Sequence, residues 1–361
     1  MLMKKLLFAA HTLEMGGIEK ALVTLLNQLV QEESYEITLV LQEKKGLFAD
    51  MLDKRVKIIE YKGSNNSNPL FRKLLNVSKR IKFMIQYYHR FDFSASFATY
   101  SKMASFVARM ASANSHLWGH ADYWELFQDP NKVKEFFQEI HSAQFKRVVF
   151  VSEEGKESYE KLVPHARQEV LVCNNLLDEK QIKEMAKEAI PYQKDSVYTF
   201  LNIGRHDEKQ KRLSRLIQAC QKLQQEGLDF RVYLIGEGPD TALYQKMVQQ
   251  DHLESKLIFL GQQKNPYPYY QLGDAVVLTS DYEGFPVVFL ESMLFKVPIL
   301  TTPVSGSRTI VERNAGIVVP KKVEDIAEKM KWMIQNRPQF SIHFDAKKYN
   351  EEIIKKIEKM F

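Results

Sequence analysis

Residues Asp274–Thr301 read DAVVLTSDYEGFPVVFLESMLFKVPILT. The apolar run Asp274–Leu278 is typical of a buried strand, Val288–Phe295 is predicted to form a helix, and Pro298–Thr301 begins a second strand. A strand, a helix and a strand in this order indicate a βαβ unit, whose strands are parallel. Because open parallel sheets bind ligands at the carboxyl ends of their strands, we expect the loop after Leu278 to form part of a binding site.

The same alternation of strands and helices runs through both halves of the chain. The second half is predicted to contain strands at Tyr198–Ile203, Arg231–Ile235 and Leu257–Leu260 and helices at Ser214–Gln225 and Thr241–Gln250. The first half is predicted to contain strands at Lys5–Ala10, Glu36–Leu41, Val56–Tyr61 and Arg147–Ser152 and a helix at Glu19–Val30. Two such series predict an α/β protein of two Rossmann-like, doubly wound domains. We place these domains at residues 1–176 and 177–340, followed by a helical segment at residues 341–361.

The composition is that of an ordinary globular protein, with 45% hydrophobic and 27% charged residues in a chain of 361. Two cysteines, Cys173 and Cys220, are too few for a disulfide framework or a cysteine-based metal site. No apolar run approaches the roughly 20 residues of a membrane-spanning helix, and the run after Lys4 and Lys5 is too short for a secretory signal. We therefore expect a cytoplasmic protein, either soluble or peripheral on the inner face of the cell membrane.

Two glutamates, Glu283 and Glu291, give the sharpest chemical signal in the sequence. The unpaired amides at the start of the following helix suit an anion such as a diphosphate. Gly284 lets the backbone approach a ligand closely, and Pro286 near the helix start has no N–H group to satisfy. We predict that Glu283 contacts a sugar hydroxyl and that Glu291 accepts hydrogen bonds from a ribose. The alternative is a capped helix with a solvated glutamate.

A basic loop gives the second signal. Gly204 and Arg205 follow the strand Tyr198–Ile203, and Lys211 precedes the next helix. Arginine and lysine donate hydrogen bonds without accepting any, so Arg205 and Lys211 suit one diphosphate. Two fixed cations can neutralise a departing diphosphate, which is work that a metal often does. The alternative is a basic surface loop without a ligand.

Glycine turns after other strands give weaker signals. Gly16 and Gly17 lie between the first strand and the first helix, where backbone N–H groups can face a phosphate. Gly236, Gly238 and Gly261 end two strands of the second half and are predicted to line a nucleobase pocket. Tight turns that need no ligand are the alternative at all of these positions.

An aromatic-rich loop is predicted at Leu117–Trp124, which contains His120 and Asp122. Histidine and carboxylate groups among Trp and Tyr side chains are typical of a sugar-binding edge. We predict a catalytic role for His120 and an acceptor-binding role for Asp122. The alternative is that both residues are structural.

Positive charge is concentrated in one segment. Residues 51–110 hold twelve Lys and Arg residues against three Asp and Glu residues, and the part from Arg72 to Arg90 holds six basic residues and no acidic one. The apolar residues of Phe71–Tyr88 predict a basic amphipathic helix. Such a helix can lie on an anionic membrane surface. The alternative is a helix that packs on the core and leaves its basic face solvated. A local surplus of this kind does not indicate nucleic-acid binding.

These motifs together resemble the retaining glycosyltransferases of family 4, which have the GT-B fold. The resemblance covers nearly the whole chain and implies two Rossmann-like domains that face each other across a cleft, an acceptor domain first and a nucleotide-sugar donor domain second, with the last helix crossing back to the first domain. It implies that Arg205 and Lys211 hold the donor diphosphate, that Glu283 and His120 lie beside the reacting sugar, and that Glu291 binds the ribose. The donor-binding set then comprises Gly16, Gly17, Gly204, Gly236, Gly238, Gly261, Gly284, Phe285, Pro286, Val287 and Glu291.

One feature of the sequence departs from the family pattern, and another agrees with it. Leu294, Phe295 and Lys296 replace the small residues that usually follow the glutamate motif, so the donor sugar cannot be inferred from them. No Asp-x-Asp pair occurs, which agrees with a metal-independent mechanism.

The sequence therefore predicts a hexosyltransferase that needs no cofactor and takes a nucleotide-diphosphate sugar, with UDP as the expected nucleotide, as its substrate. The acceptor is expected to be a saccharide or a lipid-linked saccharide in surface-polysaccharide or glycolipid assembly. The alternatives are a sugar-nucleotide epimerase of the same fold and a non-catalytic nucleotide-sugar-binding subunit. A dinucleotide oxidoreductase is disfavoured because no complete glycine fingerprint follows the first strand.

Overall fold

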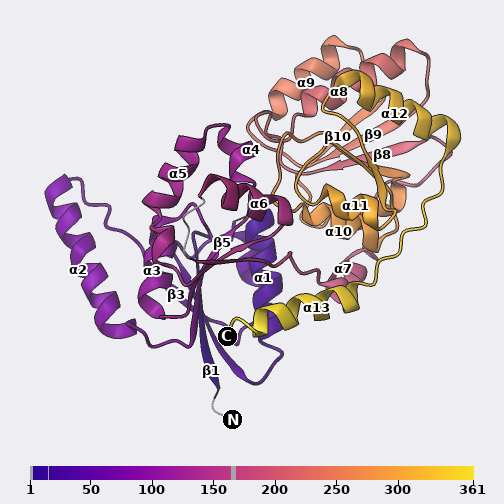
Figure 1. The fold of residues 1–361 in the computed structure, drawn as a ribbon. Helices are drawn as coiled ribbons and strands as arrows, with labels where there is room; N and C mark the ends of the chain where they lie inside the picture. The colour runs from indigo at the N-terminus through magenta and orange to yellow at the C-terminus, as the bar shows by residue number, and fades with distance from the viewer. Residues whose placement is uncertain (1–2, 15, 164–167) are drawn as a thin grey trace. The chain divides into compact units, whose positions relative to one another are not determined.

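The computed structural model describes residues 3–14, 16–163 and 168–361. The chain divides into two compact units. Unit 1 comprises Met1–Leu176 together with Asn350–Phe361, and unit 2 comprises Leu177–Tyr349. Each unit contains one parallel sheet covered by helices (Figure 1).

Unit 1 contains a sheet whose described strands follow the order β3-β2-β1-β4-β5-β6-β7. Its strands are β1 (Lys4–Ala10), β2 (Tyr35–Leu41), β3 (Lys57–Glu60), β4 (Phe93–Ser96), β5 (Ser115–Gly119), β6 (Arg147–Phe150) and β7 (Glu169–Val172). Its α-helices are α1 (Gly17–Leu29), α2 (Pro69–Tyr87), α3 (Lys102–Ala111), α4 (Tyr123–Phe127), α5 (Pro130–Glu139) and α6 (Glu153–Leu162), with 3₁₀ turns η1 (Leu47–Met51) and η2 (Ser142–Gln144).

Unit 2 contains a second parallel sheet in the order β10-β9-β8-β11-β12-β13. Its strands are β8 (Thr199–Ile203), β9 (Arg231–Ile235), β10 (Leu257–Gly261), β11 (Ala275–Leu278), β12 (Ile299–Thr301) and β13 (Gly316–Val318). Its helices are α7 (Glu179–Met185), α8 (Leu213–Gln225), α9 (Thr241–Gln250), α10 (Val287–Leu294), α11 (Ser307–Glu312) and α12 (Val323–Asn336), with the 3₁₀ turn η3 (Tyr267–Leu272). In Figure 1, α8, α9 and α12 cover one face of this sheet, and α10 and α11 lie on the other.

Both sheets have the doubly wound order, in which the chain builds one half outward from the first strand and then reverses to build the other half. The reversal lies between β1 and β4 in unit 1 and between β8 and β11 in unit 2. All recorded strand pairs are parallel. Helices cover both faces of such sheets, so β8 and β11 are buried along their whole lengths. Strands buried on both faces consist mostly of apolar residues.

The last helix, α13 (Ala346–Glu358), begins at the end of unit 2 and leads into unit 1. The Asn114 side-chain amide donates a hydrogen bond to the Met360 carbonyl at 2.7 Å. The Phe361 ring lies 4.7 Å from the Phe93 ring and 5.3 Å from the Tyr35 ring, centroid to centroid. The end of the chain is therefore part of the core of unit 1.

The loop predicted at Leu117–Trp124 is shorter than expected, because it comprises residues 120–122 only. The ends of the segment belong to β5 and α4, and β4 precedes it at a position where no strand was predicted. Buried serines in β4 explain the omission, because Ser94 and Ser96 interrupt the apolar signal of a buried strand. The Ser94 hydroxyl is satisfied by donating to the Ala108 carbonyl in α3 at 2.6 Å.

Candidate functional site

Two loops meet at the reversal point of the second sheet, one after β8 and one after β11. The Thr279 hydroxyl donates to the Lys211 and Arg212 carbonyls at 3.2 and 3.0 Å. The Asp281 amide donates to the Gln210 carbonyl at 2.8 Å. These hydrogen bonds tie the two loops together at the sheet edge where doubly wound domains bind their ligands.

Lys211 and Glu283 form an ion pair between the two loops. The Lys211 Nζ lies 2.6 Å from Glu283 Oε1, and the side chains are 18% and 7% exposed. The Ser280 hydroxyl donates to the same carboxylate oxygen at 2.7 Å, and the Gln210 amide donates to the other oxygen at 3.3 Å. Gly204 lies beside this pair, because a Cβ at that position would lie 3.6 Å from Lys211 Cε. A largely buried cation is thus held in one position by a carboxylate that is itself fixed.

Arg205 is the more exposed cation of the site, with a side chain that is 61% exposed. Its guanidinium pairs with Asp207 at 2.9 Å and contacts the Gln210 side-chain oxygen at 3.5 Å. Gln210 therefore contacts both Arg205 and Glu283. The structure thus brings the two predicted diphosphate-binding cations, Arg205 and Lys211, into one cluster. Sequence reasoning missed Gln210, although Gln210 lies between these two residues in the chain.

Asp281 fixes the loop that carries Glu283. Arg212 Nε donates to one Asp281 oxygen at 2.6 Å, and Arg215 donates to the other at 2.9 Å. Burial favours the protonated carboxyl, but the hydrogen bonds from Arg212 and Arg215 outweigh it and hold the pKa of Asp281 below its usual value. The loop is therefore fastened by a carboxylate that stays ionised.

Glu291 lies in α10 and is 2% exposed. The Tyr270 hydroxyl donates to its Oε2 at 3.0 Å, and the Tyr270 ring stacks on Phe295 with centroids 4.7 Å apart. Burial and the neighbouring Glu291 carboxylate raise the pKa of Tyr270 well above its usual value, so this hydroxyl keeps its proton. Sequence reasoning missed Tyr270 because the contact joins residues from different elements.

The segment between the glutamates forms the start of α10. Pro286 is the N-cap residue and makes no side-chain cap, and Val287 is the first helical residue. Phe285 and Pro286 are buried, and Gly284 is half-buried. The first amides of α10 thus retain the anion-binding capacity on which the prediction rests.

Gly236 and Gly238 press against the loop that carries Arg205. A Cβ on Gly236 would overlap the Gly204 carbonyl oxygen, and a Cβ on Gly238 would overlap the His206 carbonyl oxygen. The His206 amide donates to the Glu237 carbonyl at 3.1 Å, which joins the two loops. These glycines are required by contacts between backbones. Gly261 has a positive φ of 67° at the end of β10 and lies beside Glu237.

Gly16 and Gly17 lie at the reversal point of the first sheet. Gly16 is the N-cap residue of α1 and provides no side-chain cap, and a Cβ on Gly17 would meet no atom within 4 Å. From the loop after β4, the Tyr100 hydroxyl donates to Glu19 Oε1 at 3.4 Å. Sequence reasoning missed this pair because it did not predict β4.

His120 follows β5, and Asp122 caps the next helix. The ring of His120 lies 4.5 Å from that of Phe97, and its Nε2 is buried without a hydrogen-bond partner among the described residues. The Asp122 carboxylate accepts from the amides of Trp124 and Glu125 at 3.0 and 3.2 Å, which is the geometry of an N-cap. Its predicted contact with an acceptor stays a prediction, whereas its structural role is visible.

Buried His116, and half-buried His120 with its buried Nε2, make unit 1 sensitive to acid. Burial lowers the pKa of His116 and of His120 from 6.5 to about 3. Between pH 3 and pH 6.5 the unfolded chain binds these protons and the folded chain does not, so stability rises with pH in this window and levels off above it. Each histidine contributes a slope of about 1.4 kcal/mol per pH unit.

We expect urea unfolding to show this slope, and we expect His120→Gln to reduce it by the contribution of one proton. The exposed His343 supplies the control, because His343→Gln leaves the slope unchanged. An unaltered slope in His120→Gln would contradict the assignment of a neutral buried imidazole.

Residues 165–360 match the family model "Glycosyl transferases group 1", which is more than half of the chain. The chain belongs to this family. The finer assignment to family 4 stays a prediction.

Curated relatives of this group 1 glycosyltransferase match it over part of their length. The N-acetyl-alpha-D-glucosaminyl L-malate synthase of Bacillus anthracis is 32% identical over 106 residues, which cover 29% of this chain and 28% of the relative. The lipopolysaccharide 1,6-galactosyltransferase of Salmonella typhimurium is 27% identical over 158 residues, which cover 42% of this chain and 43% of the relative. The matched segments thus span less than half the length of either relative.

Solved structures match this group 1 glycosyltransferase over nearly its whole length. HepE of Anabaena, in complex with UDP and glucose, superposes with a TM-score of 0.76 at 16% identity and covers 98% of this chain and 99% of its own. The lipopolysaccharide glycosyltransferase WaaG superposes with a TM-score of 0.69 at 13% identity and covers 92% and 91%. At these identities the likeness shows the fold, and the predicted GT-B fold is confirmed.

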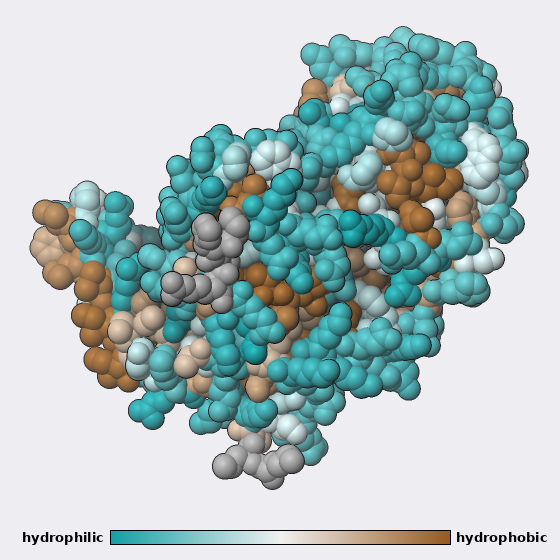
Figure 2. Space-filling model, in the orientation of Figure 1, coloured by the Kyte–Doolittle hydropathy of each residue, from teal (hydrophilic) through white to brown (hydrophobic). Residues whose placement is uncertain are grey.

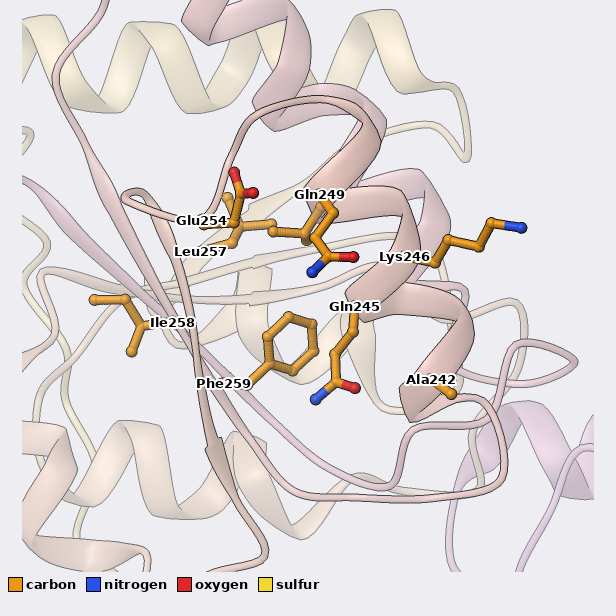
Figure 3. A pocket seen from close by; sticks show the side chains of 9 residues that line it. Ala242, Gln245, Lys246, Gln249, Glu254, Leu257, Ile258 and Phe259 are labelled. Carbon is orange, nitrogen blue, oxygen red and sulfur yellow. The ribbon is translucent and has the colours of Figure 1, made fainter.

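The depression between α9 and β10 lies apart from the predicted site. It has a volume of about 510 Å³ and is open to solvent, and Gln245 and Gln249 from α9 and Phe259 from β10 line it (Figure 3). None of the predicted site residues lines it. Within the part of the chain that the structure describes, no three His, Cys, Asp or Glu side chains are grouped to hold a metal ion.

Proposed function

We propose that this protein is a retaining, metal-independent hexosyltransferase. It takes the sugar from a nucleotide-diphosphate donor, with UDP as the preferred nucleotide, and passes it to a hydroxyl of a saccharide or lipid-linked saccharide in surface-polysaccharide or glycolipid assembly. The observation that carries the proposal is the Lys211–Glu283 pair at the reversal point of the second sheet, with Arg205 in the same cluster. HepE, which shares the fold, was solved with UDP and glucose, and a relative is a lipopolysaccharide galactosyltransferase.

The cluster suits the departure of a diphosphate. Lys211 and Arg205 offer two cations on one loop, and the first amides of α10 offer partial positive charge from the other. When the bond to the sugar breaks, negative charge grows on the phosphate oxygen. Cations that are already in place stabilise this charge without reorganisation, and that electrostatic contribution replaces a metal.

Glu283 is assigned to holding the sugar, and no group is assigned as a covalent nucleophile. Its carboxylate accepts from Lys211, Ser280 and Gln210, so about one of its four lone-pair sites remains for a sugar hydroxyl, and the paired ammonium makes the carboxylate a poor nucleophile. We therefore favour attack of the acceptor hydroxyl on the face that the diphosphate leaves, with a phosphate oxygen taking the hydroxyl proton. His120 is proposed to act as a neutral imidazole, since burial lowers its pKa to about 3.

A donor screen tests the proposal. We expect UDP-glucose, UDP-galactose or UDP-N-acetylglucosamine to raise the melting temperature, because a ligand at a hundred times its Kd stabilises the fold by about 2.7 kcal/mol. The donor that binds should also be hydrolysed slowly without acceptor, and activity should persist in EDTA. NAD⁺ serves as the control and should give no shift.

Other outcomes identify the alternatives. Interconversion of the sugar nucleotide without release of UDP would indicate an epimerase. Stabilisation without any turnover would indicate a non-catalytic binding subunit. A product with inverted anomeric configuration in its NMR spectrum would overturn the retaining assignment.

A further inference from the structure

Helix α2 of unit 1 is almost entirely exposed. Its residues Pro69–Tyr87 are all exposed to solvent except Asn76 and Tyr87, which are half-buried, and Phe83, which is buried. Phe83 is the one buried residue, and its ring packs against those of Tyr61 and Phe106 with centroids 5.4 and 6.1 Å apart. The helix therefore touches unit 1 through a narrow line of contact.

Its apolar residues lie mainly on the other side. Five of them recur at spacings of four and three residues and so share one face of the helix: Leu70, Leu74, Val77, Ile81 and Ile85. We call these residues the α2 stripe. Phe83 is two residues from both Ile81 and Ile85 and so points away from the stripe. Leu70 and Ile85 are 79% and 78% exposed.

This arrangement reverses that of an ordinary surface helix, whose apolar stripe faces the core. Figure 2 shows the result as a hydrophobic band along α2 at the edge of unit 1. The alternative, a helix that packs its apolar face on the core, therefore does not describe α2. Apolar surface in a continuous row marks a place where something else binds.

The charge of the helix identifies the partner. Residues 69–90 contain six Lys and Arg residues and no Asp or Glu. Lys79 donates to the Lys62 carbonyl at 2.8 Å, and the Arg80 guanidinium lies 5.3 Å from the centre of the Phe106 ring, so these two help to hold the helix on unit 1. Arg72, Lys73 and Lys82 are exposed.

We propose that α2 docks unit 1 on the surface of an anionic phospholipid bilayer. The α2 stripe enters the boundary between headgroups and acyl chains, while Lys73 and Lys82, which flank the stripe on its two sides, contact the anionic headgroups. A second copy of the chain fits less well, because two α2 helices would bring together ten positive charges, five from each copy, with no acidic residue on either helix. The docking does not depend on the reaction proposed above. No described helix is long and apolar enough to cross a membrane.

Flotation of the full chain with vesicles tests this proposal, and no sugar nucleotide is needed. We expect the protein to float with vesicles of phosphatidylglycerol and phosphatidylcholine and to remain unbound with phosphatidylcholine alone. Leu74→Ser with Ile81→Ser should abolish flotation and leave the melting temperature unchanged, because both side chains are exposed. The matched control is Leu243→Ser with Val311→Ser, which removes two exposed apolar side chains from unit 2 and should float normally.

A second set of variants tests the charges. Neutralising Lys73 and Lys82 with Gln should weaken binding about 25-fold, since each cation near an anionic surface contributes about fivefold. The control neutralises Lys132 and Lys134, two exposed lysines elsewhere on unit 1, and should bind normally.

The outcomes that overturn the proposal are distinct. Wild-type protein that does not float at low salt, or a stripe variant that floats like the wild type, excludes the bilayer as the partner. If the wild type instead forms a dimer in sedimentation that the stripe variant cannot form, and does not float, the stripe belongs to a contact between copies.

Discussion

Lys211→Ala should lower turnover of the donor sugar by about 10²–10³-fold, because it removes a preplaced cation from the charge that develops on the leaving diphosphate. The Lys211 side chain is 18% exposed and its ammonium lies 2.6 Å from a fixed carboxylate, so water cannot easily take its place. Donor hydrolysis and transfer, measured at saturating sugar nucleotide, give the effect. Normal turnover in this variant would sink the assignment of the cation pair.

Lower turnover of Lys211→Ala could also result from loss of stability, so the two effects have to be measured separately. Lys211→Ala leaves the buried Glu283 carboxylate without its cation, which costs about 3–5 kcal/mol of stability. The double variant Lys211→Ala/Glu283→Gln removes that unpaired charge and should recover most of the melting temperature, yet remain slow. Lys209→Ala is the matched control, because Lys209 is an exposed lysine of the same loop, and it should keep both activity and stability.

Gly236→Ala should destabilise unit 2 by about 3–5 kcal/mol. The residue has a φ of 140°, which an L side chain rarely adopts, and a Cβ would overlap the Gly204 carbonyl oxygen. Strain and overlap add because neither backbone segment can move freely: the Gly204 amide donates to the Ile235 carbonyl at 3.0 Å, and the Gly236 amide donates to the Gly261 carbonyl at 2.9 Å. Urea unfolding measures the loss.

Comparison with Gly227→Ala separates the cost of the steric overlap in Gly236→Ala from the cost of its backbone strain. Gly227 also has a positive φ, of 72°, but a Cβ there would meet no atom within 4 Å. It should cost only about 1–2 kcal/mol. Equal losses in the two variants would show that the close approach of the Gly204 and Gly236 segments contributes nothing.

The second sheet could be predicted well from the sequence, because its strands are covered on both faces and read as apolar runs. The predicted strand Asp274–Leu278 and helix Val288–Phe295 differ by one residue at their ends from β11 and α10. β4 was not predicted because Ser94 can be buried only when its hydroxyl donates to the Ala108 carbonyl of α3, and this carbonyl comes near only in the folded chain.

The location of the candidate site could be predicted from the carboxyl ends of the parallel strands, and the strand order of the structure brings the loops after β8 and β11 together there. The partners within it did not follow. Ser280, Gln210 and Tyr270 each join a predicted residue through contacts that depend on side-chain packing. Asp122 carried a local signal that was not used: Asp122 and Glu125 have the spacing of a helix N-terminus.

Unit 1 cannot be completed in the order of synthesis. Its core includes Ile353, Ile357 and Met360 from the last turns of the chain, and unit 2 is encoded between them and the rest of unit 1. A nascent chain can bury its residues only after they leave the ribosome. All of unit 2 has therefore been synthesised before the last residues of unit 1, and unit 2 can complete its fold first. The first-synthesised part of unit 1 keeps the surface around Phe93 uncovered until Phe361 has left the ribosome.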